Sequence, residues 1–174
     1  EGLQQNILAN PPVQNLIDVV WAPNGEKAIL KSIDDAGSAH THLFTVSDKS
    51  VKELNPFMRS VAFSPGSDRI VYNYLNTQNG DNTIAIANPD GSKFKTLHQP
   101  IFADFAVFWP KEETVLVQTN PSYVSETHLF ALDTRVGALT KVLPKNFPGL
   151  ASVWSGDGNR GLFTRVSNDG EILP

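Results

Sequence analysis

The sequence contains no cysteine, which excludes disulfide bonds, thiolate nucleophiles and cysteine-ligated metals. It also has no apolar run of the roughly 18 residues that a membrane-spanning helix needs, so we expect no membrane insertion. Its 14 basic and 18 acidic residues give a net charge of −4 and form no block of one sign. Because phosphate binding needs a concentrated basic patch, we expect no nucleic-acid partner.

The residue patterns of common catalytic centres are missing as well. There is no Gly-X-Ser-X-Gly nucleophile elbow, and no glycine-rich phosphate loop precedes a helix. The adjacent carboxylates Asp34-Asp35 and Glu112-Glu113 are interpreted as solvated loops, because paired acid and base groups must face one site. We therefore expect a chain that is not an enzyme and that needs no cofactor.

The segment His40-Thr41-His42 is the pattern closest to a metal site. Two histidines at i and i+2 on a strand share a face and could bind zinc, and Asp34-Asp35 is near in sequence. His42, however, occupies the position that Thr83 and His128 occupy in other copies of the repeat described next. A polar residue at the start of a strand is the favoured interpretation, and we expect no metal.

An aromatic residue, a turn rich in Pro, Gly, Asn or Asp and a short apolar strand recur four times. The aromatic residues are Trp21, Phe63, Phe108 and Trp154, at intervals of 42, 45 and 46 residues. Each unit has room for several short strands, and a period in the forties with that content is typical of a β-propeller. We predict an all-β propeller with about three complete four-stranded blades and parts of a fourth.

The predicted blades span 16–54, 60–97 and 105–143, followed by a partial blade at 150–174, all within one domain of residues 1–174. The segment 4–9 resembles the last strand of the other units and is a candidate closing strand. It could pair into the partial blade and close a ring. Alternatively, the chain is a processed or excised piece of a longer propeller, which is favoured because four blades make a cramped ring. Open sheet edges also invite a second copy, so a homo-oligomer could complete the propeller.

The turns resemble those of the TolB-type, WD40-like (PD40) propeller repeats of bacteria. Trp21-Ala-Pro-Asn-Gly, Phe63-Ser-Pro-Gly-Ser and Trp154-Ser-Gly-Asp-Gly match that pattern, whereas Phe108-Trp-Pro-Lys-Glu lacks the Asp-Gly pair. The resemblance implies the propeller fold and a location that is periplasmic, extracellular or elsewhere in the cell envelope. The family includes a periplasmic translocation component that binds lipoprotein and toxin peptides, and gating domains of serine peptidases.

Binding residues of a propeller concentrate in the loops of one face, and three loops here are long and polar. They span 32–41, 75–82 and 119–126. Phe57, Phe102 and Phe147 recur every 45 residues in the adjoining loops, where packing between blades is the favoured role and an aromatic rim the alternative. Aromatic and arginine anchors carry most of the affinity of protein interfaces. The candidate partner-binding residues are Phe57, Arg59, Phe102, Asp104, Tyr123 and Glu126.

These observations favour a non-catalytic binding or scaffold module with a protein or peptide partner. One alternative is the substrate-gating propeller of a larger serine-peptidase-like enzyme, whose catalytic residues lie outside this sequence. Another alternative is a carbohydrate-binding propeller, because the loops are rich in Asn, Ser, Thr and Tyr.

Overall fold

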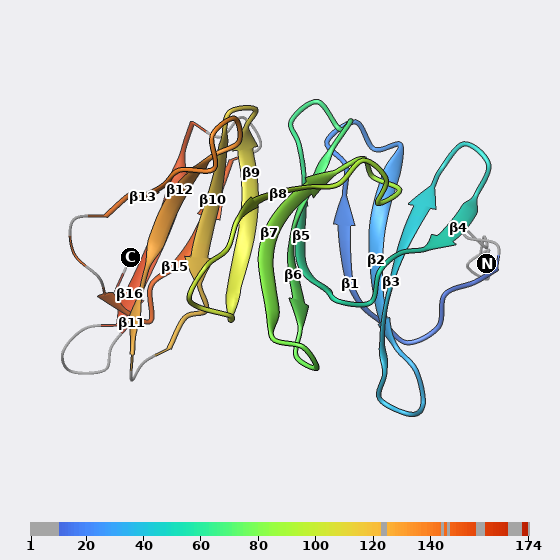
Figure 1. The fold of residues 1–174 in the computed structure, drawn as a ribbon, viewed down its shortest axis with the longest axis horizontal. Coiled ribbons are helices and arrows are strands. Elements are labelled where there is room, and N and C mark those ends of the chain that lie inside the picture. Colours follow the sequence, from blue (N-terminus) through green and yellow to red (C-terminus); the bar gives the residue numbers. More distant parts are fainter. Residues whose placement is uncertain are drawn as a thin grey trace, which may run out of the picture.

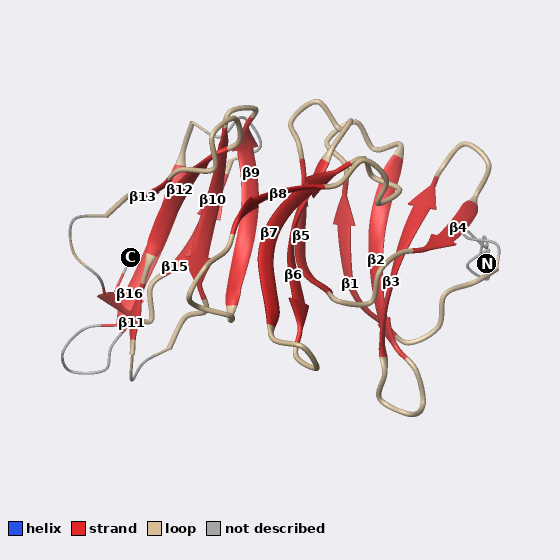
Figure 2. Ribbon diagram, in the orientation of Figure 1, coloured by secondary structure: helices blue, strands red, loops and turns tan. Residues whose placement is uncertain are grey.

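A computed structural model describes residues 11–122, 125–143, 145, 147–155, 159–166 and 172–173. Strands are the only regular elements in this part of the chain, and Figure 2 shows them as a row of sheets. The all-β prediction is therefore confirmed. The described residues form no helix that is long and apolar enough to cross a bilayer.

Four of the sheets are blades, and the strands of each blade run outward from the inner edge in sequence order (Figure 1). Blade 1 holds β1 (Leu16–Trp21), β2 (Lys27–Ile33), β3 (Ala39–Thr45) and β4 (Ser50–Glu53). Blade 2 holds β5 (Met58–Phe63), β6 (Ile70–Asn76), β7 (Asp81–Ala87) and β8 (Lys95–His98). Blade 3 holds β9 (Phe105–Lys111), β10 (Thr114–Thr119), β12 (Leu129–Asp133) and β13 (Leu139–Lys141). Blade 4 holds β15 (Ala151–Trp154), β16 (Gly161–Val166) and β17 (Ile172–Leu173).

The predicted turns close the inner hairpins. In blade 1 the Gly25 amide donates to the Ala22 carbonyl at 2.9 Å, and Gly25 has a φ of 73°, which glycine adopts without steric cost. The turn pairs Trp21 with Ala28, as the equivalent turns pair Phe63 with Ile70 and Trp154 with Gly161. The chain therefore reverses directly after each of these aromatic residues.

Apolar side chains on both faces of the middle blades form the core. One cluster joins blades 1 and 2 and includes Ile29, Leu43 and Ile70. A second joins blades 2 and 3, and a third joins blades 3 and 4. Because each middle blade is covered on both faces, its strands are almost continuously apolar, as in Ile70-Val71-Tyr72.

The third repeat differs from the prediction by one residue. Phe63 of blade 2 packs against blade 1, and Trp154 of blade 4 packs against blade 3. In blade 3 the residue that faces the preceding blade is Trp109, whereas Phe108 faces blade 4. The turn of blade 3 is shorter, since Lys111 pairs with Thr114, and a bulge follows between Thr114 and Leu116. The bulge shifts the pairing of β9 with β10 by one residue. Trp109 therefore takes the structural position that the repeat pattern predicts for Phe108.

Blade 3 also carries an additional short pairing. The strand expected at His128-Leu129-Phe130-Ala131-Leu132 begins at Leu129, and β11 (Glu126–Thr127) precedes it. β11 leaves the blade and pairs with β14 (Phe147–Pro148), joining Thr127 to Phe147. The candidate closing strand at 4–9 lies outside the described residues.

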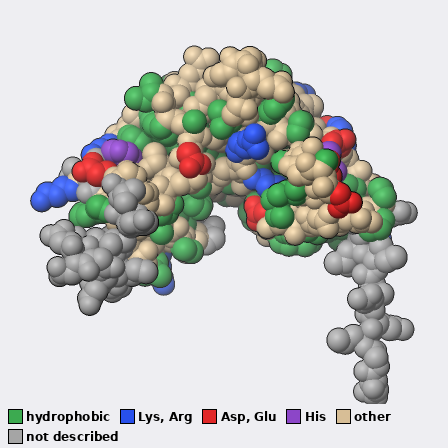
Figure 3. Space-filling model, turned by 90° about the horizontal axis from the view of Figure 1, so that it is seen from below, with side chains coloured by type: hydrophobic (Ala, Val, Ile, Leu, Met, Phe, Trp, Pro, Cys, Tyr) green, Lys and Arg blue, Asp and Glu red, His purple; other side chains and the backbone are tan. Residues whose placement is uncertain are grey.

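The blades are arranged as an arc, which Figure 3 shows as an arch with a hollow on one side. The outer face of blade 1 leaves Ile17, Val19 and Trp21 exposed at 61%, 41% and 51%. The corresponding faces of blades 2, 3 and 4 are covered by the blade before them.

Candidate functional site

The long polar loops lie at one end of the blades. The connections β2–β3 and β6–β7 are at the lower end in Figure 1, where β10 also ends, together with the links from β4 to β5 and from β8 to β9. We call this end the loop face. The turns β1–β2, β5–β6 and β9–β10 lie at the opposite end, which we call the turn face. This arrangement follows from antiparallel order, because alternate connections leave a sheet at opposite ends.

The candidate aromatics of the loop face pack against the blade that follows them. The Phe57 ring lies 5.9 Å from the Tyr74 ring in an edge-to-face contact. Phe102 stacks on Phe130 at 5.4 Å and meets Phe105 edge to face, also at 5.4 Å. Both phenylalanines are only partly exposed, so the geometry gives them contacts between a loop and a blade.

Asp104 and Glu126 are exposed on the loops around blade 3. The Asn120 side chain donates to the Asp104 carboxylate at 2.5 Å, and the Asn120 amide donates to the Asp104 carbonyl. Asp104 thus fixes the start of the β10–β11 loop. Glu126 is the first residue of β11 and pairs with Pro148. Tyr123 lies outside the described residues.

Arg59 stands at the start of the inner strand of blade 2, where blade 2 meets blade 1. It is exposed, and its guanidinium makes no hydrogen bond or ion pair within the described residues. The Lys31 ammonium donates to the Arg59 carbonyl, and Asp18 lies across the β1–β2 pair from Lys31. Burial lowers the pKa of Lys31, Asp18 acts in the opposite direction, and the Arg59 charge lowers it further. The structure therefore places two cations and one carboxylate at the inner edge of the loop face.

Sequence reasoning identified Arg59 in this group but missed Lys31 and Asp18. The signal was present, since Lys31 directly follows the apolar residues Ala28-Ile29-Leu30 within the same strand. A lysine in a strand that is buried on both sides needs a reason to be there. Lys31 donates to the carbonyl of Arg59, however, and Arg59 lies 28 residues further along the chain.

The histidine pattern of blade 1 is a hydrogen-bonded cluster. His40 Nε2 lies 3.2 Å from Asp34 Oδ2, and His40 Nδ1 lies 3.1 Å from Glu53 Oε1. These bonds to Glu53 and then Asp34 raise the pKa of His40. Both ring nitrogens of His40 are thus occupied, and within the described ranges no group of three His, Cys, Asp or Glu residues is arranged so that it could hold a metal ion.

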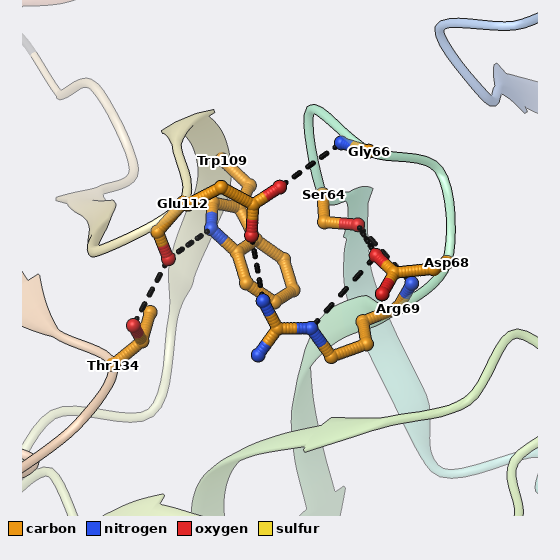
Figure 4. Close-up of polar contacts among 7 residues, drawn as sticks. All are labelled: Ser64, Gly66, Asp68, Arg69, Trp109, Glu112 and Thr134. Atoms are coloured by element: carbon orange, nitrogen blue, oxygen red, sulfur yellow. Dashed lines mark hydrogen bonds and ion pairs between the residues drawn. The ribbon is translucent and has the colours of Figure 1, made fainter.

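The turn face holds a polar contact between blades 2 and 3 (Figure 4). Glu112 accepts from the Arg69 guanidinium at 2.6 Å and from the Gly66 amide at 3.0 Å. Its carbonyl accepts from Trp109 Nε1 at 3.3 Å and from the Thr134 hydroxyl at 3.0 Å. Every carboxylate oxygen of Glu112 has a partner, so this cluster stabilises the blade interface and leaves little capacity for a ligand.

A central hollow of about 330 Å³ opens beside this cluster. The inner strands of all four blades line it, and Trp21, Phe63, Phe108 and Trp154 are among its walls. The repeated aromatics therefore contribute to the wall of the propeller axis near the turn face, at the end opposite the predicted binding loops.

No protein-family model matches the chain, and no curated protein matches it. Among solved structures it is similar to TolB from Acinetobacter baumannii, with a TM-score of 0.71 and 14% identity over 90% of this chain and 39% of that one. A putative TolB from Agrobacterium tumefaciens gives 0.67 and 15% identity over 93% and 61%. The acylaminoacyl peptidase of Pyrococcus horikoshii gives 0.60 and 14% identity over 88% and 28%.

The chain spans less than two thirds of the length of each of these proteins. At such identities the likeness concerns the fold, which is that of a TolB-like β-propeller.

Proposed function

We propose that this chain is a non-catalytic binding module that presents its loop face to a protein or peptide partner. The observation that carries the proposal is the guanidinium of Arg59, which is exposed and has no partner within the described residues, whereas Arg69 and Arg135 each form ion pairs. A free guanidinium on a rigid sheet scaffold is a typical anchor for a carboxylate, which it binds through two parallel hydrogen bonds.

Lys31 strengthens this anchor. Its ammonium is held beside Arg59 by the bond to the Arg59 carbonyl, so the positive charge stays at the blade junction. Asp18 offsets one of the two charges and leaves a net positive site. We therefore infer that the partner contributes an acidic side chain or a free carboxyl terminus.

Binding to a peptide array tests this proposal. The probes are acidic 12-residue peptides and the same peptides with Asp and Glu replaced by Asn and Gln. The proposal expects retention of acidic peptides by the wild type, at least a tenfold loss of affinity in Arg59→Ala, and an unchanged melting temperature. Arg135→Ala is the control, because it removes an exposed arginine that already pairs with Asp133 and Glu113. Equal retention of neutral peptides, or equal losses in both variants, contradicts the proposal.

We also propose that the repeats are of the TolB-type, WD40-like class and that the protein acts in the bacterial cell envelope. The aromatic-Pro/Gly turns and the TolB-like fold support this assignment. Fractionation of the source bacterium tests the location. Recovery with periplasmic proteins agrees with it, and recovery with cytosolic proteins contradicts it.

A second copy of the chain is a further proposed partner. Ile17, Val19 and Trp21 are exposed on blade 1, and Val153 and Leu162 are exposed on blade 4 at 69% and 66%. Apolar faces of this kind are buried against a neighbouring sheet elsewhere in the molecule. Light scattering across a concentration series tests the proposal, which expects twice the monomer mass of 19.0 kDa. A monomer at every concentration contradicts it.

A further inference from the structure

Each joint between two neighbouring blades is built from two kinds of face. We call the side of a blade that meets the next blade its forward face, and the side that meets the previous blade its rear face. Blades 1, 2 and 3 each place a buried apolar residue of the second strand on the forward face. These residues are Ile29, Val71 and Leu116, and none of them is more than 5% exposed.

The rear faces of blades 2 and 3 are apolar in the same way. Their side chains belong to the cluster that joins each blade to the previous one. On the inner strands they are Val61 with Phe63 and Val107 with Trp109, none more than 6% exposed. A joint is therefore formed by one forward face and one rear face, which contribute different residues.

The rear face of blade 1 is open along its inner strand. Val19 and Trp21 occupy the positions that the valine and the phenylalanine hold in blade 2, but they are 41% and 51% exposed. Leu30 and Phe44, further out on the same face, are 6% and 5% exposed. A partner that docks on this face would thus contact blade 1 through β1.

The forward face of blade 4 is open as well. Leu162 follows Gly161, which pairs with Trp154 as Ala28 pairs with the aromatic residue of blade 1. It therefore stands at the position of the buried Ile29. Leu162 also pairs across strands with Val153, and the two side chains are 66% and 69% exposed. The two ends of the arc thus carry the two complementary halves of one joint.

One polar side chain on each forward face ties the joint together. It lies two residues after the buried apolar residue and donates to a carbonyl near the start of the inner strand of the next blade. The donors are Lys31, Asn73 and Gln118, and the acceptors are the carbonyls of Arg59, Ala103 and Leu150. Thr164 holds this position on blade 4 and is only partly buried. Because a hydroxyl can donate in the same way, blade 4 keeps both the apolar and the polar part of a forward face.

We propose that the forward face of blade 4 docks against the rear face of blade 1 of a second copy, head to tail. The inference rests on the second copy proposed above as a partner and assigns the surfaces that meet. A second copy is the occupant because each chain carries both halves of the joint, and the same two kinds of face already pack together between its own blades. In the docked pair, Leu162 and Val153 cover Trp21 of the other copy, and Thr164 donates to the start of its β1. A contact between two rear faces would instead be isologous and would join two halves of the same kind.

Cross-linking of engineered cysteines tests this arrangement, since the chain has no cysteine of its own. In the joint between blades 2 and 3, the Val107 amide donates to the Ser60 hydroxyl at 3.0 Å. The equivalent positions of the open halves are Ala151 on blade 4 and Val19 on blade 1. The full chain with Ala151→Cys is mixed with the full chain with Val19→Cys and treated with a short bismaleimide. We expect a covalent two-chain product in this mixture and in neither variant alone.

The matched control is Ala151→Cys mixed with Gln78→Cys, because Gln78 is exposed in the β6–β7 turn and belongs to neither face. This mixture is expected to give no product. A product from Val19→Cys alone shows a contact between two rear faces, which overturns the head-to-tail arrangement and leaves the second copy as a partner. Absence of the mixed product also overturns it, and the mass of the wild type then shows whether the second copy fails as well.

Charged substitutions give an independent measurement. Trp21→Asp disables only the rear face and Leu162→Asp only the forward face, and the melting temperature of each variant reports whether it is folded. Each variant alone is expected to associate at least tenfold more weakly than the wild type, whereas their equimolar mixture recovers association through one intact joint. A mixture that stays monomeric overturns the proposal. Arg59→Ala is expected to leave association unchanged, which separates this interface from the peptide site.

Discussion

The guanidinium of Arg69 lies 5.1 Å from the centre of the Trp109 ring, and this contact joins blade 2 to blade 3. Arg69 simultaneously binds Glu112, the residue whose carbonyl accepts from the Trp109 indole. The two residues therefore form a closed set of contacts at the turn face (Figure 4). Trp21 occupies the equivalent position in blade 1, where no described blade covers it.

This difference predicts unequal costs for the same substitution. Trp109 is 6% exposed, so Trp109→Ala is expected to lower the free energy of unfolding by about 3–5 kcal/mol through the cavity that it leaves. Trp21 is 51% exposed and contacts the Phe44 ring edge to face, so Trp21→Ala is expected to cost about 0.5–1.5 kcal/mol. Urea unfolding of the two variants measures both values. Similar losses would show that the position, and not its burial, determines the cost.

Gly137 offers a second matched comparison. Its φ is +72°, and an added Cβ would lie 2.1 Å from the Leu97 carbonyl oxygen of blade 2. Gly25 has nearly the same φ, +73°, but nothing lies within 4 Å of its Cβ position. Alanine at Gly25 is expected to cost about 1–2 kcal/mol from the backbone alone. Alanine at Gly137 adds about 1–3 kcal/mol, because the two blades must move apart.

Thermal unfolding of Gly25→Ala and Gly137→Ala measures this difference. His98 reports on the same contact, since its Nδ1 lies 3.1 Å from the Gly137 carbonyl. We expect the His98 resonances to shift in Gly137→Ala and to stay in place in Gly25→Ala. Equal stability of the two variants would contradict the close approach of blade 3 to blade 2.

The repeat period predicted the propeller because each blade repeats the same local chemistry. An aromatic residue, a turn and an alternating strand specify a hairpin without reference to distant residues. The assignment of Phe108 failed for the same reason. Two aromatics stand side by side in Phe108-Trp109, and only the bulge after the turn decides which of them faces blade 2.

The candidate sites were less accessible to sequence reasoning, because they depend on contacts between blades. Arg59 was selected as an anchor, but the adjacent Lys31 comes from another blade. Tyr72 looked like one more apolar position of an inner hairpin. Tyr72 also lines a groove to which Glu53 and Leu54 of blade 1 contribute, a contact that no residue near Tyr72 encodes.

A buried polar network between blades 3 and 4 provides a third prediction. The Ser152 hydroxyl donates to Gln118 Oε1 at 2.5 Å, and Trp154 Nε1 donates to Ser152 at 3.1 Å. Gln118 and Ser152 are 4% and 8% exposed. Gln118→Leu leaves the Ser152 hydroxyl without this acceptor and is expected to lower the free energy of unfolding by about 1–3 kcal/mol.

The double variant Gln118→Leu/Ser152→Ala is the control for this network. Because it removes both partners, it is expected to cost less than the sum of the single changes. Chemical unfolding of the four proteins gives the coupling free energy. A coupling near zero would mean that the two side chains do not act together.

The last prediction concerns His40 and His42, which stack with ring centres 6.1 Å apart but respond to pH in opposite directions. Glu53 and Asp34 raise the pKa of His40, so its stabilising effect is complete below the unfolded pKa of 6.5 and is lost as pH rises through the higher folded pKa. Burial lowers the pKa of His42, and its buried Nδ1 has no hydrogen-bond partner in the described part of the chain. The stability associated with neutral His42 is complete above pH 6.5 and declines as pH falls below it.

Urea midpoints between about pH 5.5 and about pH 8 measure both effects, since this range spans the ordinary pKa of histidine. The difference in stability between wild type and His40→Gln is expected to grow as pH falls. The difference between wild type and His42→Gln is expected to shrink over the same interval. Since the two histidines are only two residues apart, parallel pH profiles for the two variants would mean that the carboxylates around His40 do not distinguish it from His42.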